Sequence, residues 1–204
     1  MTTILLIRHG QVEGIDPPRF RGRKELPPTE LGIAQANSVA RRIADQWEPL
    51  AVYTSPMMRC VNTGAIIAEA CGVTASSLQI LNDLDYGTWQ WKSYDEVRSE
   101  SLVLFSRWFT TPHLVQFPGE ESLQDLLART SDVLRFILER HIDDTVVLVG
   151  HESVNRALLL QLLDQPISAY WRLAQAPCAI SEIEVIGECV RINRINDTTW
   201  EGAS

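Results

Sequence analysis

The stretch that decides the fold is TILLIRHG, residues 3–10, in which an apolar run ends directly in an arginine, a histidine and a glycine. A short run that is entirely apolar indicates a strand covered on both faces, as in parallel sheets. The carboxyl ends of such strands are where α/β folds build their sites. We therefore expect a strand over residues 4–7 that delivers Arg8 and His9 to one edge of a sheet.

The rest of the chain alternates apolar runs of strand length with amphipathic helical patterns, which predicts a mostly parallel α/β sheet. Further strands are expected at residues 51–54, 78–81 and 145–149, and the alternating tail around Gly187 predicts a hairpin or two edge strands. Helices on both faces of the sheet make the expected fold a three-layer α/β/α sandwich. A length of 204 residues favours one domain spanning 1–204.

Five helices are predicted from N-cap residues and apolar stripes of helical spacing. Their expected limits are Thr29 to Gln46, Ser55-Pro56 to just before Gly72, a start at Ser93 with Glu96 in a capping box, Ser122 to about Arg140, and a start after His151. In the second of these, serine would be the N-cap and proline the first helical residue.

Composition and charge narrow the class of protein. The chain is 45% hydrophobic and 22% charged, with a formal charge of −8, which argues against binding to nucleic acid or to a membrane surface. No apolar run approaches the roughly 18 residues of a membrane span, and the first run is too short for a signal peptide. Scattered cysteines without metal-ligand spacing predict reduced thiols. These features favour a cytoplasmic enzyme, and nothing in them sets its oligomeric state.

Three predicted strands end in residues that suit an anion. The first ends at Arg8 and His9, the second runs into Ser55 with Arg59 one turn into a helix, and the fourth delivers His151 just before another helix. In a parallel sheet these ends share one rim, beside helix N-termini whose unpaired N–H groups favour anions. Two histidines and two arginines there predict a phosphate pocket that needs no metal.

With these residues in place, the chain resembles the histidine phosphatase superfamily, in the branch named after cofactor-dependent phosphoglycerate mutase. The matching segments follow the family's order and are LLIRHGQ, RFRGRKELPPTELGIAQA, VYTSPMMRCVNTGAIIA, LNDLDYGTWQW, FPGEES and VVLVGHESVNRALL. An Arg-His-Gly triplet alone would be weak, but six ordered segments make the resemblance specific. It implies a phosphoglycerate mutase-like fold and a metal-independent phosphatase that needs no cofactor and acts on a small phosphorylated metabolite.

The resemblance also implies roles for residues. His9 would be the nucleophile, attacking phosphorus to give a phosphohistidine. Arg8, Arg59 and His151 would hold the phosphoryl oxygens, where charge must be stabilised during transfer. A carboxylic acid would then protonate the leaving alkoxide and later, as a carboxylate, activate the water that hydrolyses the intermediate.

Two departures from the family pattern leave that acid open. The mutase branch usually has glutamate where this chain has Asp83, which is one methylene shorter. The usual glycine after the second histidine is Glu152 here, and the acid-phosphatase branch uses an acidic residue at that place as its proton donor. We favour Asp83, because its flanking segment matches the mutase branch, with Glu152 as the alternative. Asp85 is a more remote candidate.

The early loop, residues 15–28, follows the first strand and is expected to contact the substrate. Gln11 replaces the glutamate that commonly follows the triplet, and Arg21 stands where glutamine is common. Gln11, Arg21 and Gly22 are predicted to bind substrate. Four cations, Arg19, Arg21, Arg23 and Lys24, form either a solvated loop or a lip for a second anionic group of the substrate.

Two other functions compete with hydrolysis. A phosphoglycerate mutase would return the phosphoryl group to substrate, but classical mutases carry an insertion after the general-acid segment. Only about sixty residues separate Asp83 from the last central strand here, which favours a phosphatase. A binding module for phosphorylated ligands, with a failed proton donor, is the alternative outside the enzymes.

Overall fold

The computed structural model describes residues 1–117 and 121–202, so residues 118–120 of the FPGEES segment lie outside the described residues. Its centre is a six-stranded sheet with the strand order β3-β2-β4-β1-β5-β6. The strands are β1 (Thr2–Arg8), β2 (Pro49–Thr54), β3 (Ala75–Ser77), β4 (Thr145–Gly150), β5 (Ile180–Ile186) and β6 (Cys189–Asp197). The first four pair in parallel, and the last two form an antiparallel hairpin at one edge. The predicted mostly parallel sheet and the terminal hairpin are confirmed.

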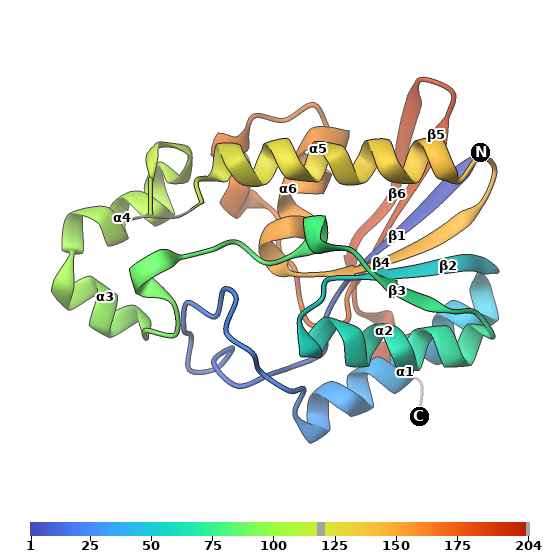
Figure 1. The fold of residues 1–204 in the computed structure, drawn as a ribbon, viewed down its shortest axis with the longest axis horizontal. Coiled ribbons are helices and arrows are strands. Elements are labelled where there is room, and N and C mark those ends of the chain that lie inside the picture. Colours follow the sequence, from blue (N-terminus) through green and yellow to red (C-terminus); the bar gives the residue numbers. More distant parts are fainter. Residues whose placement is uncertain (118–120, 203–204) are drawn as a thin grey trace.

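Helices cover both faces of this sheet, which confirms the predicted three layers (Figure 1). One layer holds α1 (Glu30–Gln46) and α2 (Met58–Cys71), and the other holds α5 (Leu123–Arg140) and α6 (Glu152–Leu162). Two further helices, α3 (Tyr94–Glu100) and α4 (Leu102–Thr110), lie beyond the end of the sheet (Figure 1). None of the helices in the described part of the chain combines the length and apolar character that spanning a membrane requires.

The apolar strands are buried on both sides because successive side chains point to opposite faces. In β1, Ile4 and Leu6 belong to the core that also contains Leu126 of α5. Leu5 and Ile7 belong to the core under α1 and α2. The same alternation in β4 explains why its run is apolar at every position.

Most of the predicted helix caps are confirmed. The Thr29 side chain accepts a hydrogen bond from the Gly32 N–H at the start of α1. Capping boxes open α3 at Ser93 and α5 at Ser122. The second helix ends at Gly72, whose positive φ of 69° terminates it.

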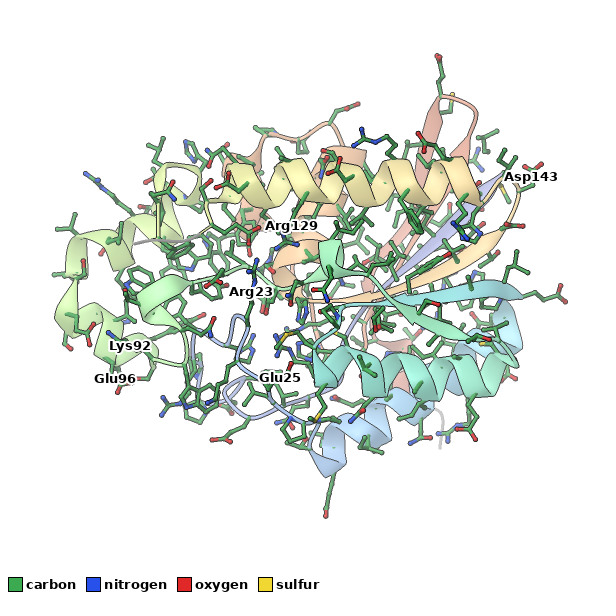
Figure 2. All side chains as sticks on the ribbon, viewed as in Figure 1. Arg23, Glu25, Lys92, Glu96, Arg129 and Asp143 are labelled. Atoms are coloured by element: carbon green, nitrogen blue, oxygen red, sulfur yellow. The ribbon has the colours of Figure 1, made fainter. Side chains whose placement is uncertain are left out.

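The predicted start of α2 is wrong. Ser55 does not cap this helix, which begins at Met58. The Ser55 hydroxyl accepts a 3.3 Å hydrogen bond from the Met57 N–H, ahead of the helix, and lies 2.8 Å from Nε2 of His151. The helix terminus is satisfied from outside: Glu25, in the early loop, accepts a 3.1 Å hydrogen bond from the Met58 N–H (Figure 2).

The predicted strand at 78–81 is also wrong. Its neighbour β2 ends at Thr54, and the Leu78 N–H donates to the Thr54 carbonyl as the last bond of the ladder. With no partner beyond that point, residues Gln79–Leu81 form a 3₁₀ turn. The strand that pairs with β2 on the side away from β4 is the preceding segment, Ala75–Ser77. The apolar run buries Leu81 in the core without joining the sheet.

The sequence prediction missed α4. Its inward side chains, Phe105 and Trp108, are three residues apart and buried, as helical spacing requires. Leu102 and Val103 on the same short helix are exposed, which blurred the apolar stripe. No disulfide joins cysteines within the described residues. Cys60 is buried as expected, whereas Cys189 is exposed.

Candidate active site

The backbone after His9 runs against the start of α1, which explains the glycine that follows the histidine. A Cβ atom on Gly10 would lie 2.4 Å from the carbonyl oxygen of Gly32, and one on Gly32 would lie 2.1 Å from that of Gln11. Neither position has room for a side chain. This close contact holds the end of β1 and the ring of His9 at the sheet edge.

The His9 side chain is buried and has one reactive nitrogen. Its Nδ1 lies 2.7 Å from the Gly10 carbonyl oxygen, which only accepts hydrogen bonds, so Nδ1 carries the proton and Nε2 keeps its lone pair. Burial, and then the neighbouring Arg59, His151 and Arg8, hold the pKa of His9 well below its ordinary value. The imidazole is therefore neutral near pH 7, as a nucleophile requires.

The second histidine lies beside the first, as the strand ends predicted. The ring centroids of His9 and His151 are 5.4 Å apart. Nδ1 of His151 accepts a 3.3 Å hydrogen bond from Nε of Arg59, and Nε2 donates to the Ser55 hydroxyl at 2.8 Å. Burial and the Arg59 charge lower the pKa of His151 well below its ordinary value, so this ring is neutral too.

Arg59 is buried and joins the early loop to the centre of the site. Its Nη1 donates to the Lys24 carbonyl at 2.8 Å and its Nη2 to the Gly22 carbonyl at 2.6 Å. Nη2 also donates to Oδ2 of Asp83 at 3.0 Å. Gly22 has a φ of 47°, a conformation that side chains rarely adopt, which lets its carbonyl face this guanidinium.

The carboxylate of Asp83 meets donors on both oxygens. Oδ1 accepts from the Leu84 N–H at 2.8 Å and from the Ser153 hydroxyl. Oδ2 accepts from Arg59 and lies 3.5 Å from Nδ1 of His151. The Asp83 carboxylate therefore lies between Arg59 and the second histidine, His151.

The loop that carries Asp83 is held by a separate ion network. The Asp83 carbonyl accepts from Nε of Arg23 at 3.2 Å and from Nη2 of Arg129 at 3.1 Å. These two arginines come from the early loop and from α5 and converge on it (Figure 2). Glu121 pairs with both, at 3.0 Å from Arg129 and 3.5 Å from Arg23. Asp85 pairs with Arg23 at 3.3 Å.

Glu152, the first residue of α6, contacts three arginines. Its Oε2 lies 3.4 Å from Nη1 of Arg8 and 3.4 Å from Nη2 of Arg21, and its Oε1 lies 2.7 Å from Nη1 of Arg156. Burial alone would raise the pKa of Glu152, but these arginines together hold it below the ordinary value. Burial lowers the pKa of Arg8 to about 10, and its Nε is buried with no partner among the described residues.

These groups surround one pocket at the carboxyl ends of the central strands. It is lined by His9, Arg19, Phe20, Arg21, Gly22, Asp83, Tyr86, Tyr94, Glu152, Ser153, Arg156 and Trp171. Five of the predicted site residues are in that lining. Arg8, Arg59 and His151 are buried behind it, each in contact with a lining carboxylate.

Other predicted site residues lie outside the lining. The side-chain oxygen of Gln11 accepts from the Thr29 hydroxyl at the start of α1. Of the four cations in the early loop, Arg19 and Arg21 line the pocket, whereas Arg23 turns toward Asp83 and Lys24 is exposed. Only half of that cluster can therefore contact a ligand.

Several lining residues were not predicted. Ser153 and Arg156 follow His151 on α6, and the spacing of Glu152 and Arg156 is that of an i,i+4 ion pair, so a helical projection would have found them. The aromatic rings of Tyr86, Tyr94 and Trp171 come from separate segments. Within the described residues, no group of three or more histidine, cysteine or acidic side chains is placed to hold a metal ion.

The family model, the related proteins and the solved structure that match this chain agree with one another. A family model described as histidine phosphatase superfamily (branch 1) matches residues 4–198. Phosphoserine phosphatase 1 of Hydrogenobacter thermophilus is 30% identical over 171 residues, which cover 84% of this chain and 81% of the relative. The metal-independent phosphoserine phosphatase of Arabidopsis thaliana is 30% identical over 202 residues, covering 98% of this chain and 79% of the relative. Among solved structures, Bacillus stearothermophilus YhfR superposes with a TM-score of 0.92 at 26% identity, covering 98% of this chain and 99% of that one.

Proposed function

The chain belongs to the histidine phosphatase superfamily, branch 1, and on that premise we propose that it hydrolyses small phosphate monoesters without a metal ion, through a phosphohistidine on His9. The observation that carries this proposal is the state of the His9 ring. Its Nδ1 is bonded to the Gly10 carbonyl, which leaves Nε2 unprotonated in a pocket rich in arginine.

In the first step the Nε2 lone pair of His9 attacks phosphorus while the bond from phosphorus to the ester oxygen breaks. The charge on the transferring group is stabilised by Arg8, Arg21 and Arg59, and the neutral ring of His151 lies alongside. The Nε of Arg8, which has no partner in the described part of the chain, is a buried donor that an anion can satisfy.

We assign the proton transfer to Asp83. In its protonated form it donates to the leaving alkoxide as the ester bond breaks. Its Oδ2 is hydrogen-bonded to Arg59, one of the residues that hold the phosphoryl group. Glu152 is less suited to this role, because three arginines stabilise its charged form.

In the second step water attacks the phosphohistidine. The water oxygen bonds to phosphorus while the phosphorus–nitrogen bond breaks, and the Asp83 carboxylate takes a proton from the water. Inorganic phosphate leaves, and both His9 and Asp83 return to their starting forms. Water is the only co-substrate in this balance.

The substrate is a compact ester. The aromatic rings of Tyr86, Tyr94 and Trp171 and the side chains of Arg19 and Arg21 all contribute to the pocket lining. The two relatives named as phosphoserine phosphatases make phosphoserine the first ester to test.

The experiment is a screen of phosphomonoesters for phosphate release in the presence of a chelator. We expect turnover of nitrophenyl phosphate and of at least one small alkyl phosphate, and both activities should disappear in His9→Asn. Binding without turnover of any ester would favour a binding module. Phosphoryl transfer between phosphoglycerates that depends on 2,3-bisphosphoglycerate would favour a mutase.

A further inference from the structure

The carboxylate of Glu152 is surrounded by more positive charge than it can neutralise. Arg8 and Arg21 share its Oε2, and Arg156 contacts its Oε1. One negative charge against three positive charges leaves two in excess, which equals the charge of a phosphate dianion. The nearby pair of Arg59 and Asp83 is balanced within itself.

This cluster is sheltered from solvent. The side chains of Arg8, Arg156 and Arg21 are 6%, 7% and 14% exposed, and that of Glu152 is 26% exposed. Charges in such a place are screened far less than on an open surface, so removing one of them changes anion affinity measurably.

From this arrangement we propose that Glu152 is an internal counter-charge, which occupies the arginines of the empty pocket and weakens its hold on inorganic phosphate so that product leaves. The inference rests on the proposed function, since it assigns the pocket to phosphate. It gives Glu152 a role in product release in place of the proton-donor role considered above.

The arginines do not depend on Glu152 for their placement, which makes the proposal specific. Arg156 donates through Nε to the Leu173 carbonyl at 2.7 Å, and its guanidinium lies 4.5 Å from the centre of the Trp171 ring. Arg21 donates to the Gly14 carbonyl at 2.6 Å. Arg8 donates to the Gln175 carbonyl. Each arginine therefore keeps one anchor when Glu152 loses its charge.

Neutralising this residue should accordingly tighten anion binding, and the test is titration calorimetry of the whole protein with inorganic phosphate. Glu152→Gln should lower the Kd for phosphate by at least about tenfold, because it removes one like charge from beside the bound anion. Its competitive inhibition constant for phosphate should fall in parallel. Glu152→Asp keeps the charge and should stay close to the parent protein.

The matched control is Glu100→Gln, which removes the same charge from an exposed ion pair with Lys92 and should leave the phosphate Kd unchanged. A tighter Kd cannot result from a misfolded variant. Equal or weaker phosphate binding by Glu152→Gln, or equal tightening by Glu152→Asp, would overturn the proposal. The titration involves no turnover, so an inactive protein that still shows the tighter Kd would sink only the proposed hydrolysis.

Discussion

Nδ1 of His9 lies 2.7 Å from the carbonyl oxygen of Gly10, and this contact decides which nitrogen of the ring can react. The carbonyl fixes the proton on Nδ1 and turns Nε2 into the free base. Gly10 can make the contact because its own backbone is pressed against Gly32, where a side chain would not fit. The order Arg-His-Gly is thus explained by packing as much as by chemistry.

The identity of the proton donor is tested with esters of different leaving groups. Asp83→Asn should lower kcat for an alkyl phosphate by about 10²–10⁴-fold, the usual contribution of a general acid. Nitrophenyl phosphate should lose much less, because nitrophenolate leaves without protonation. Initial rates of phosphate release on both esters give the comparison. Equal losses on the two esters would show that Asp83 is not the proton donor. A larger loss on the alkyl ester in Glu152→Gln would assign that role to Glu152.

The stability of the fold should depend on pH through the two buried histidines. Burial, and then Arg59, lower the pKa values of both His9 and His151 in the folded protein. Below about pH 6.5 the unfolded chain therefore binds more protons than the folded one, and the free energy of unfolding falls as the pH drops. Above that pH both rings are neutral in the folded and the unfolded chain, so they no longer make the free energy of unfolding depend on pH.

Urea denaturation at about pH 7.5 and about pH 5.5 measures this effect. The parent protein should lose stability over the interval, and His151→Asn should lose less, since the asparagine does not titrate. An identical pH dependence in the two proteins would show that the ring of His151 does not carry the effect.

The support of the Asp83 loop should matter for turnover. Arg129 holds the Asp83 carbonyl and pairs with Glu121, and it lines no part of the pocket. Arg129→Lys cannot make both contacts in one plane, so we expect kcat for alkyl phosphates to fall by roughly tenfold with a smaller change in KM. Arg135→Lys, at an exposed ion pair on the same helix, is the control and should be neutral.

A loss that depends on the leaving group of the ester is the signature of this positioning role. Because Arg129 acts through Asp83, its variant should lose more on the alkyl ester than on nitrophenyl phosphate. If Arg129→Lys lost the same factor on both esters, the network would be structural support for the fold alone.

The contact between β1 and α1 predicts a large loss of stability. Gly32→Ala places a methyl group 2.1 Å from the Gln11 carbonyl oxygen, so the backbone must move. We expect a loss of roughly 3 kcal/mol or more in the free energy of unfolding, in the range of severe backbone clashes. Gly72→Ala, where nothing lies within 4 Å, should cost only about 1 kcal/mol for its positive φ. Equal losses in the two variants would contradict the close-packing explanation.

The central strands and the meeting of the two histidines could be predicted because they follow from one rule. Apolar runs such as those before Arg8 and His151 form strands buried on both faces, and parallel strands end at one edge. The N-caps at Thr29 and Ser122 could also be predicted, because these side chains accept hydrogen bonds from backbone N–H groups within the first turn of their own helices.

Long-range contacts set the limits of that prediction. Ser55 has the pattern of an N-cap, but His151 competes for its hydroxyl and Glu25 caps the helix from another segment. The run at 78–81 has strand composition, yet β2 has already ended at Thr54 and offers it no partner. No local pattern encodes either outcome.

The sequence predicted that the residues at the strand ends would come together. It did not predict several other residues that line the pocket. Residues carried by strand ends, such as His9, were found from position alone. Tyr86 and Trp171 reach the pocket from segments that pack only in the folded chain. The three arginines around Glu152 come from β1, the early loop and α6, so their shared carboxylate was not foreseen.

The central claim is a phosphoryl group carried on residue nine, and rapid quenching tests it directly. The protein is mixed with an excess of nitrophenyl phosphate, quenched in alkali, where phosphohistidine survives, and mapped by tandem mass spectrometry. We predict one phosphoryl group, on Nε2 of His9, formed at the rate of the nitrophenolate burst and absent from His9→Asn. Turnover with no phosphorylated histidine, or with the label on another residue, would contradict the account.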